Sequence, residues 1–489
     1  MFLEQQTAYR DTVLPALQSS QRHIMLALCA AALTYVAEAG AAHDPAAPVT
    51  VGALAPTDVA LPQYAIIELS RGQVQDRTVR ASNNVGDHAG TANFDEPPGL
   101  KPVIWDPYGR LRLLALPPGF TAAEVWAIND LGEAAGDWGP GGVFWNTAGE
   151  PFRMDDLGGR RTEVRGMNNL GQVVGSADLP TINGSHAFVW SLETGMIDLG
   201  DLSPTEEYAS VAYDINDDGV IVGSSVAANG LGDKPVAWVG GQIRQLPELP
   251  IDGARDYARS INEAGVIIGS AGDPATYQRG IAIWPSINES PLILPDPFPR
   301  DEVRPIAINN HNIVLGEGPT NRSSALLWYD WEKQPLRLFD LLPWGHRWKL
   351  FSSDALNDFN QVSGLAAYNG RSSAFLATPV YPTITMSKVV PGRAGEMNTI
   401  TLSNLTPNAT VQVLVGTHGG GTIIPGCSML QNVLQIDNPK LVATAVADSN
   451  GIATVSGLIP TFRRWQTLVF QAVVRDTCEI SNLVVQTIQ

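Results

Sequence analysis

The chain has 489 residues, of which 44% are hydrophobic and only 16% are charged, and its formal net charge at pH 7 is −18. A chain of this length has room for two or three domains, and its apolar content is sufficient for buried cores. The excess of acidic residues argues against nucleic acid or an anionic membrane surface as a partner, because both would repel it.

Residues 1–42 have the pattern of a secretory signal peptide with a long n-region. Arg22 and His23 precede an apolar run from Ile24 to Val36, and small residues follow at positions 37–42, where cleavage is expected. The run is too short to form a comfortable membrane span. We therefore expect a secreted, extracellular protein, or one in the periplasm or at the cell surface. Residues 43–63 are rich in Pro and Ala and are expected to form a linker.

Residues 64–380 contain a sequence unit that recurs seven times. Each copy has an Asn, usually in an Ile-Asn pair, that is followed after three residues by Gly or Asn, and then a short apolar run that ends at a second glycine. A turn at this box needs one residue at positive φ, which Gly adopts freely and Asn tolerates best. Each box is therefore expected to form a tight hairpin between strands a and b of its unit. We assign the seven leading asparagines as Asn84, Asn129, Asn168, Asn216, Asn262, Asn309 and Asn357.

Two further strands, c and d, complete the unit. In six copies strand c ends in Trp, namely Trp105, Trp145, Trp190, Trp238, Trp284 and Trp328. The strands are apolar on both faces, which indicates burial on both sides. A four-stranded unit of about 40 to 48 residues is typical of a blade of a β-propeller. Packing between blades accounts for the tryptophans, and turn stabilisation accounts for the asparagines without a ligand.

The number of strands predicts how the ring closes. The seventh unit has no strand d, whereas the segment from Tyr64 to Ser70 is a strand without a partner before the first unit. We expect Ala65 to Leu69 to pair with the strand around Ala374 to Leu376 and so complete the seventh blade. Such closure removes the exposed edges of an open sheet. The predicted fold is all-β: a seven-bladed β-propeller closed by the N-terminal strand, followed by a small β-sandwich.

The unit resembles the HAF repeat of probable extracellular proteins, which is named for a His-Ala-Phe triplet. Here the triplet is His186, Ala187 and Phe188, ahead of Trp190 and the run from Met196 to Gly200. The other copies keep the hairpin and most keep the Trp, but they lack these letters. The resemblance covers residues 64–380 and implies secretion and a repeat architecture. It implies no reaction that can be carried onto residues.

Residues 384–489 have a different composition, with alternating apolar and polar residues separated by turn signals such as Asp448 to Gly451. About a hundred residues of this pattern predict a β-sandwich. The region is similar to C-terminal β-domains of other secreted bacterial proteins in its Val411 to Thr417 and Ile424 to Cys427 stretches. Cys427 and Cys478 are the cysteines that remain after signal cleavage, and an even pair in a secreted chain predicts a disulfide.

No sequence motif predicts a cofactor or a metal site. The run from Asp214 to Gly219 resembles the start of a calcium loop, but Ser225 occupies the position that should carry Glu. The same run is already explained as the fourth hairpin turn. The histidines are too scattered for a zinc site. The glycine-rich run from Gly416 to Gly421 has no phosphate-loop lysine, so we interpret it as a flexible connection between strands.

Strand order places the a–b hairpins and c–d turns on one side of the ring and the b–c and d–a connections on the other. The second side has the more variable loops, which is where binding is expected. Its loop Trp344-Gly-His346-Arg347-Trp348 could stack on a sugar or hold a peptide; alternatively, the two tryptophans fill a junction between blades. The candidate ligand-binding residues on this face are Trp344, His346, Arg347, Trp348, Trp138, Tyr208 and Tyr257.

Two functions fit these observations. The favoured hypothesis is an exported, non-enzymatic propeller, probable partners being a glycan or an extracellular protein, with the chain a monomer. The alternative is a polysaccharide-active hydrolase or lyase on the same loop face, because propellers host such sites and fold alone does not decide function.

Overall fold

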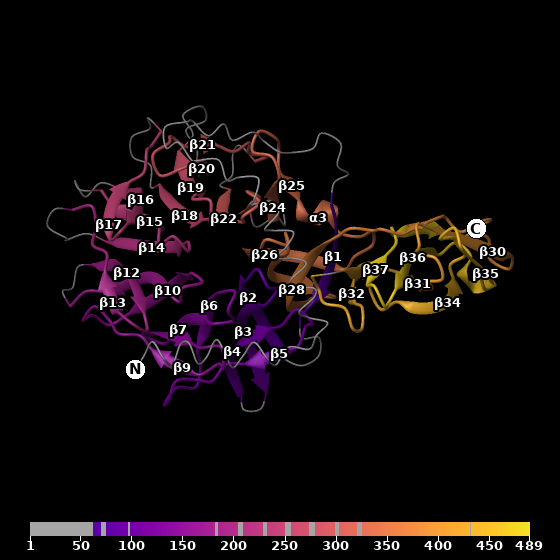
Figure 1. The fold of residues 1–489 in the computed structure, drawn as a ribbon, viewed down its shortest axis with the longest axis horizontal. Helices are drawn as coiled ribbons and strands as arrows, with labels where there is room; N and C mark the ends of the chain where they lie inside the picture. The colour runs from indigo at the N-terminus through magenta and orange to yellow at the C-terminus, as the bar shows by residue number, and fades with distance from the viewer. Residues whose placement is uncertain are drawn as a thin grey trace. The chain divides into compact units, whose positions relative to one another are not determined.

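The computed structural model describes residues 62–69, 75–95, 98–180, 184–203, 209–227, 232–249, 256–272, 279–298, 303–319, 325–430 and 432–489 (Figure 1). The predicted signal peptide and nearly all of the linker lie outside these residues. Within them, almost all regular structure is β-strand; the helices are a short α3 (Leu338–Leu341) and a 3₁₀ turn, η3 (Thr461–Arg463). No helix in the described ranges has the length and hydropathy that a membrane span requires.

Seven four-stranded antiparallel sheets form the blades of a β-propeller, as predicted. The innermost strand of each blade contacts the innermost strand of the next, so the blades follow one another around a ring, from β2 (indigo) through β14 (magenta) to β26 (orange) in Figure 1. The blades, from inner to outer strand, are the following. Blade 1 has β2 (Gln75–Ser82), β3 (His88–Asp95), β4 (Pro98–Trp105) and β5 (Leu111–Leu113); blade 2 has β6 (Glu124–Ile128), β7 (Ala134–Trp138), β8 (Gly141–Trp145) and β9 (Pro151–Arg153); blade 3 has β10 (Thr162–Met167), β11 (Val173–Asp178), β12 (Ser185–Ser191) and β13 (Gly195–Asp198); blade 4 has β14 (Ser210–Ile215), β15 (Ile221–Val226), β16 (Asp233–Val239) and β17 (Gln242–Gln245); blade 5 has β18 (Tyr257–Ile261), β19 (Ile267–Gly272), β20 (Arg279–Trp284) and β21 (Leu292–Ile293); blade 6 has β22 (Arg304–Ile308), β23 (Val314–Glu317), β24 (Ala325–Trp328) and β25 (Leu336–Arg337); blade 7 has β26 (Trp348–Leu356), β27 (Val362–Tyr368), β28 (Arg371–Val380) and β1 (Gln63–Glu68).

The N-terminal strand closes the ring, as the strand count predicts. β1 is the outer strand of blade 7 and pairs antiparallel with β28, with Ile67 opposite Leu376. Beyond the regular pairing, the Leu69 N–H donates to the Ala374 carbonyl at 3.2 Å. Side chains of β1 enter two separate cores: Tyr64 and Ile66 pack toward blade 6, and Ala65 and Ile67 pack toward blade 1.

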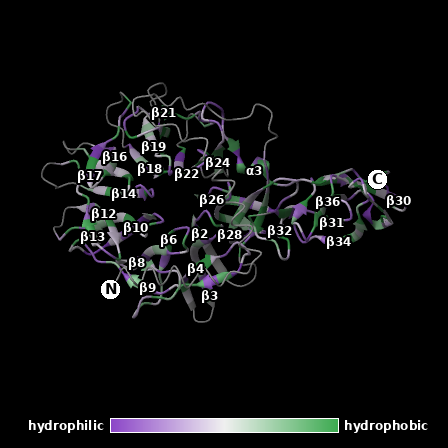
Figure 2. Ribbon diagram, viewed as in Figure 1, coloured by the Kyte–Doolittle hydropathy of each residue, from purple (hydrophilic) through white to green (hydrophobic). Residues whose placement is uncertain are grey.

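The cores of the propeller lie between adjacent blades rather than at its centre. Each of seven buried apolar clusters combines residues of two neighbouring blades, and these stretches can be followed by colour along the strands in Figure 2. The six predicted tryptophans of strand c are all buried. Four of them also donate a hydrogen bond from Nε1 to a carbonyl of the preceding blade, as Trp238 does to Leu199 at 2.9 Å. They therefore stabilise the blade junctions, as predicted.

A ring of seven buried asparagines joins all the blades. In each hairpin the asparagine Oδ1 accepts the N–H four residues on, at 2.7 to 3.1 Å, which fixes the turn. Its Nδ2 donates to the backbone carbonyl of the equivalent asparagine in the next blade, at 2.9 to 3.3 Å, and the seventh bond returns to the first blade. The members of this asparagine ring are Asn83, Asn129, Asn168, Asn216, Asn262, Asn309 and Asn357.

The assignment of Asn84 to the first box is wrong by one residue. Asn83 makes the turn contacts, accepting the N–H of Gly86, which lies three residues later at φ +89°. Two adjacent asparagines made the sequence ambiguous, and the turn geometry selects the first. The prediction that Asn replaces Gly at the positive-φ position holds for Asn312 and Asn360, whose φ angles are 60° and 58°.

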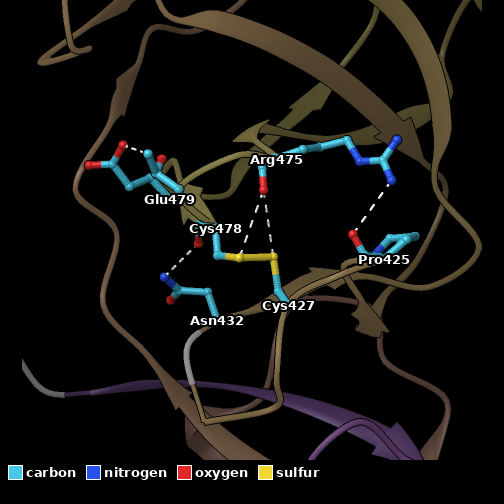
Figure 3. The surroundings of a disulfide bond; sticks show 7 residues. Pro425, Cys427, Asn432, Arg475, Cys478 and Glu479 are labelled. Atoms are coloured by element: carbon cyan, nitrogen blue, oxygen red, sulfur yellow. Dashed lines mark hydrogen bonds between the residues drawn. A yellow bond between two sulfur atoms is a disulfide. The ribbon is translucent and has the colours of Figure 1, made fainter. Parts of the chain in front are cut away.

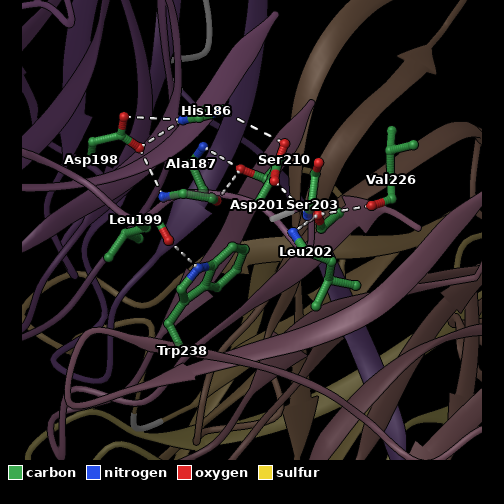
Figure 4. Close-up of polar contacts among 12 residues, drawn as sticks. His186, Ala187, Asp198, Leu199, Asp201, Leu202, Ser203, Ser210, Val226 and Trp238 are labelled. Carbon is green, nitrogen blue, oxygen red and sulfur yellow. Dashed lines mark hydrogen bonds and ion pairs between the residues drawn. The ribbon is translucent and has the colours of Figure 1, made fainter. Parts of the chain in front are cut away.

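The His-Ala-Phe triplet lies on β12 and helps to join blade 3 to blade 4 (Figure 4). The buried His186 side chain contacts two carboxylates, with Nδ1 at 2.9 Å from Asp198 and Nε2 at 3.7 Å from Asp201. The next backbone N–H, of Ala187, donates to the Ser210 hydroxyl of β14 at 2.9 Å. Burial acts to raise the pKa of Asp198, but hydrogen bonds from His186 and from the Gly200 N–H lower it by more. The triplet is part of the blade junction.

The C-terminal region is a β-sandwich, as predicted. A three-stranded sheet of β29 (Thr385–Met386), β30 (Met397–Ser403) and β35 (Ala453–Leu458) packs on a five-stranded sheet through one apolar cluster. The larger sheet consists of β34 (Lys440–Val446), β31 (Thr410–Gly416), β36 (Thr467–Val474), β37 (Glu479–Ile480) and β38 (Val484–Thr487). Its opposite face contributes Leu414, Val469 and Val473 to the apolar cluster that contains residues of β1.

The sandwich contacts the strand that closes the ring. A hairpin of β32 (Gly419–Ile423) and β33 (Val433–Ile436) contacts β1. A Cβ at Gly421 would lie 2.5 Å from the Ile66 carbonyl oxygen, so only glycine permits this approach. The interpretation of residues 416–421 as a flexible connection is therefore corrected: most of this run is a strand whose glycines allow close packing. The exposed edge of blade 7 is covered as a result.

The predicted disulfide between Cys427 and Cys478 is present (Figure 3). It joins the loop after β32 to the segment before β37. The same loop contacts the propeller, because the Met429 N–H donates to the Pro107 carbonyl at 2.6 Å and the Met429 carbonyl accepts from the Gln361 side chain at 3.2 Å. The disulfide thus ties the loop that grips blades 7 and 1 to the core of the sandwich.

Removing β1 should open the ring. Deletion of residues 63–69 takes away one edge of blade 7 and apolar side chains from two inter-blade cores, so we expect the melting temperature to fall by about 10 °C or more. Deletion of residues 43–61, which leaves β1 intact, serves as the control. Equal melting temperatures for the two deletions, measured by differential scanning calorimetry, would show that β1 does not hold the ring closed.

The disulfide should form in the mature protein and stabilise it. Thiol titration of the denatured, unreduced protein should detect no free thiol. The double variant Cys427→Ser/Cys478→Ser should lose about 2–5 kcal/mol of unfolding free energy, because the cross-link closes a long loop. Recovery of two titratable thiols from unreduced protein would contradict the assignment.

Candidate functional site: the central channel

Each innermost strand has a β-bulge at the same position, three residues before the ring asparagine. The register of β2 with β3, for example, shifts between Val79 and Ala81, which leaves Arg80 unpaired. A bulge changes the direction of a side chain relative to the regular pleat. Here all seven bulge residues are half-buried and line one central cavity. This bulge ring consists of Arg80, Trp126, Arg165, Tyr213, Arg259, Ile306 and Asp354.

The second glycine of each repeat lies opposite the bulge. In six blades a Cβ at this glycine would come within 1.8 to 2.3 Å of a carbonyl oxygen on the innermost strand; at Gly136 this oxygen belongs to Glu124. Any larger residue would therefore force the two strands apart. The sequence repeat and the channel lining have a common cause, because the glycine permits the bulge that turns a side chain toward the axis.

Cations and aromatic rings alternate around half of the bulge ring. The three arginines come from blades 1, 3 and 5, and Trp126 and Tyr213 come from the blades between them. The Arg80 guanidinium lies 4.8 Å from the centre of the Trp126 ring, and that of Arg259 lies 5.4 Å from the Tyr213 ring. These are cation–π distances.

Two of these arginines also have acidic neighbours. Arg80 Nη1 lies 3.4 Å from Asp354 Oδ1, and Arg165 Nη2 lies 2.5 Å from Glu163 Oε2. Burial raises the pKa of Asp354, and the nearby Arg80 offsets only part of this effect. Among the residues that the structure describes, no carboxylate lies within ion-pair distance of Arg259.

A second ring lies toward the hairpin end of the cavity, one residue after the asparagine ring. Each member accepts, through its side-chain oxygen, the backbone N–H of the preceding member at 2.7 to 2.9 Å, and the ring is closed. Burial, together with the nearby charge of Asp217, raises the pKa of Glu263. The members of this second ring are Asn84, Asp130, Asn169, Asp217, Glu263, Asn310 and Asp358.

The cavity between these two rings has a volume of about 320 Å³. This lies at the lower end of the range of about 300–1,000 Å³ for small-molecule pockets. Its wall offers guanidinium donors and aromatic faces at one level and carboxylate and amide oxygens at the other. Within the described part of the chain, no three His, Cys, Asp or Glu side chains are arranged to hold a metal ion.

The structure disperses the residues predicted for the loop face. Trp344 is 51% exposed, and its carbonyl accepts the Gly419 N–H at 3.0 Å. Arg347 Nη2 lies 2.7 Å from His418 Nε2, on the C-terminal domain. Trp348 is only 5% exposed and packs on Tyr368, with ring centres 4.9 Å apart. Trp348 thus occupies a core, as the junction-filling alternative describes, and cannot stack on a ligand from there.

The remaining predicted residues lie elsewhere. His346 packs edge-on against Phe339 at 4.7 Å, and burial lowers its pKa. Trp138 donates from Nε1 to the Gly142 carbonyl at 3.1 Å, in blade 2. Tyr257 packs against Tyr213 at 5.8 Å, which makes it the predicted residue with a direct contact to the bulge ring. Tyr208 lies outside the described residues.

Sequence reasoning missed the channel although a signal was available. Three residues before the ring asparagine, otherwise similar repeats carry Arg, Trp, Arg, Tyr, Arg, Ile and Asp. A variable position inside a uniform frame is where specificity is expected. The assignment of Asn84 concealed it in blade 1, because it placed Ala81 where the bulge residue is Arg80.

Asp137 is a titratable group near neutral pH beside the bulge ring. Burial raises the pKa of Asp137 to about 7, although its carboxylate accepts the Val164 N–H at 2.9 Å. It pairs with Glu124 in the β6–β7 register, and Glu163 precedes Val164 on β10. The group is therefore a carboxylic acid among carboxylates, which is a feature of general acids in hydrolases.

Comparisons with known proteins support the fold alone. The chain matches no known family model, and no curated protein is significantly similar to it. Similar solved structures include the β-propeller domain of the Trilobed protease from Pyrococcus furiosus (TM-score 0.40, 11% identity, 63% of this chain and 97% of that chain). Another is the gluconolactonase XC5397 from Xanthomonas campestris (TM-score 0.31, 8% identity, 67% of this chain and 99% of that chain). At these values the likenesses say nothing about the ligand or activity of this protein.

The raised pKa of Asp137 should make stability depend on pH. The folded state holds the proton more tightly than the unfolded state, so this stabilisation is present below about pH 4 and is lost as the pH rises through about 7. Asp137→Asn keeps the acceptor for the Val164 N–H but cannot ionise. Relative to wild type, the variant should gain about 1–2 kcal/mol of unfolding free energy between about pH 5 and about pH 8, measured by urea denaturation. The exposed Asp218→Asn is the control, and an Asp137→Asn difference that does not change with pH would refute the assignment.

Proposed function

We propose that this protein is an exported binding scaffold whose central channel holds part of a glycan. The observation that carries the proposal is the bulge ring: seven equivalent backbone distortions turn seven different side chains toward one cavity of about 320 Å³. A repeat scaffold does not need this variation for its own stability. The site therefore differs from the loop face expected from the sequence.

The lining suits a sugar. Trp126 and Tyr213 offer aromatic faces to the apolar face of a pyranose ring, and the second ring offers oxygen acceptors to its hydroxyls. The wall is also rigid, because the asparagine ring and the second ring fix every hairpin to its neighbour. A rigid site loses little conformational entropy when a ligand binds. These features favour binding over a site that must change shape.

Removal of the two aromatic rings should weaken binding without unfolding the protein. A screen of oligosaccharides by isothermal titration calorimetry identifies the ligand. Trp126→Ala/Tyr213→Ala should then weaken its binding at least about tenfold, or about 1.4 kcal/mol, because stacking is lost. The matched control is Tyr108→Ala/Trp465→Ala, which removes two exposed aromatic rings outside the channel.

The same titrations separate the channel from the loop face. Trp344→Ala changes the exposed indole of the loop without touching the buried Trp348. Binding that falls with Trp344→Ala and is unaffected by Trp126→Ala/Tyr213→Ala would place the ligand on the loop face and refute the channel. Melting temperatures of all variants show whether a loss of binding reflects unfolding.

Asp137 favours a second function, hydrolysis of the bound glycan. A carboxylic acid with a pKa of about 7 that lies near Glu124 and Glu163 could protonate a leaving oxygen while a neighbouring carboxylate activates water. The oligosaccharide screen tests this directly if products are analysed. Turnover that is abolished in Asp137→Asn, with binding retained, would establish the enzyme over the binding scaffold.

A further inference from the structure

We infer that the channel recognises an acidic sugar, with a carboxylate of a uronic acid bound among Arg80, Arg165 and Arg259. This inference rests on the proposed function, since it specifies the ligand class of the same channel. It follows from the arrangement of the three guanidinium groups, from the separation of charge along the channel, and from unpaired donors in the wall.

The three arginines surround a common volume. They come from alternate blades, and all three line the same cavity. Arg259 stacks on Tyr213 and, within the described residues, has no carboxylate partner, so its charge is available to a ligand. Arg80 and Arg165 each retain exposure of about a third of the side chain beside their acidic neighbours. Guanidinium groups bind carboxylates by paired hydrogen bonds, which an uncharged sugar cannot match.

The wall contains hydrogen-bond donors that lack acceptors. Arg80 Nε, Trp126 Nε1 and Arg165 Nε are covered by neighbouring atoms and have no hydrogen-bond partner. They belong to consecutive blades, in the part of the bulge ring where cations and aromatic rings alternate. An unpaired buried donor costs about 1–3 kcal/mol. A ligand rich in acceptors would relieve this if the side chains turn toward it, whereas a ligand rich in donors would not.

Charge is separated along the channel axis. The bulge ring has three arginines and one aspartate, whereas the second ring has four acidic residues and no cation. A ligand with a carboxylate at one end and hydroxyl groups at the other matches both levels. Trp126 and Tyr213 lie beside the arginines, so the ring that carries the carboxylate can stack where its charge is bound. The volume of about 320 Å³ admits a mono- or disaccharide unit.

Paired disaccharides test the inference by calorimetry. Galacturonate, glucuronate and mannuronate disaccharides are compared with those of galactose, glucose and mannose, from which they differ only by the carboxylate. At least one acidic member should bind about tenfold or more tightly than its neutral partner, and added salt should reduce the difference. Arg259→Met, which keeps the length of the side chain and removes its charge, should abolish most of this preference. The exposed Arg244→Met is the control and should retain it.

The outcomes distinguish the two proposals. If a neutral sugar binds as tightly as its acidic partner, and Trp126→Ala/Tyr213→Ala weakens both, the channel binds glycans but the acidic class is wrong. If acidic sugars bind equally well to wild type and Arg259→Met, the carboxylate is held elsewhere and the inference fails. If no sugar binds, both proposals fail. Preferential binding of a zwitterionic dipeptide, the other ligand class with separated charge, would also overturn the acidic sugar.

Discussion

The hydrogen bond from each ring asparagine to the next blade is the contact on which the rest of the propeller depends. One side chain fixes its own hairpin through Oδ1 and the neighbouring blade through Nδ2, as Asn168 does with Gln172 and Asn216. Each bond contributes only about 1 kcal/mol, but seven buried bonds in a closed ring hold every hairpin at the same height. The second ring repeats the connection through backbone N–H groups. The inner end of the channel is therefore fixed from every side.

This rigid frame allows one position per blade to vary. The glycine opposite each bulge admits the backbone distortion, and the bulge residue then faces the axis whatever its chemistry. Stability and specificity are thus assigned to different residues of the same repeat. The C-terminal sandwich contributes to the frame from outside, because it covers β1, the strand that closes the ring, and the disulfide between Cys427 and Cys478 secures the loop that contacts Pro107 and Gln361.

The sequence predicts the fold well because the repeat encodes it locally. Turn residues such as Asn312 and Asn360, the buried Trp238 and the unpartnered first strand each indicate one feature, and the structure confirms all of them. The site could not be predicted in the same way. A bulge shifts the register by one residue, so a strand pattern does not show that Arg80 faces the channel. Contacts between distant segments were also invisible, which is why Trp348 was assigned to an exposed loop and residues 416–421 to a flexible one.

A crystal structure of the protein with a bound uronate disaccharide tests the central claim most directly, because it locates the ligand without reliance on variants. The account predicts difference density between the bulge ring and the second ring, with the sugar against Trp126 or Tyr213 and its carboxylate near Arg259. Density on the loop face beside Trp344, or an empty channel at a ligand concentration that saturates binding in solution, would contradict it.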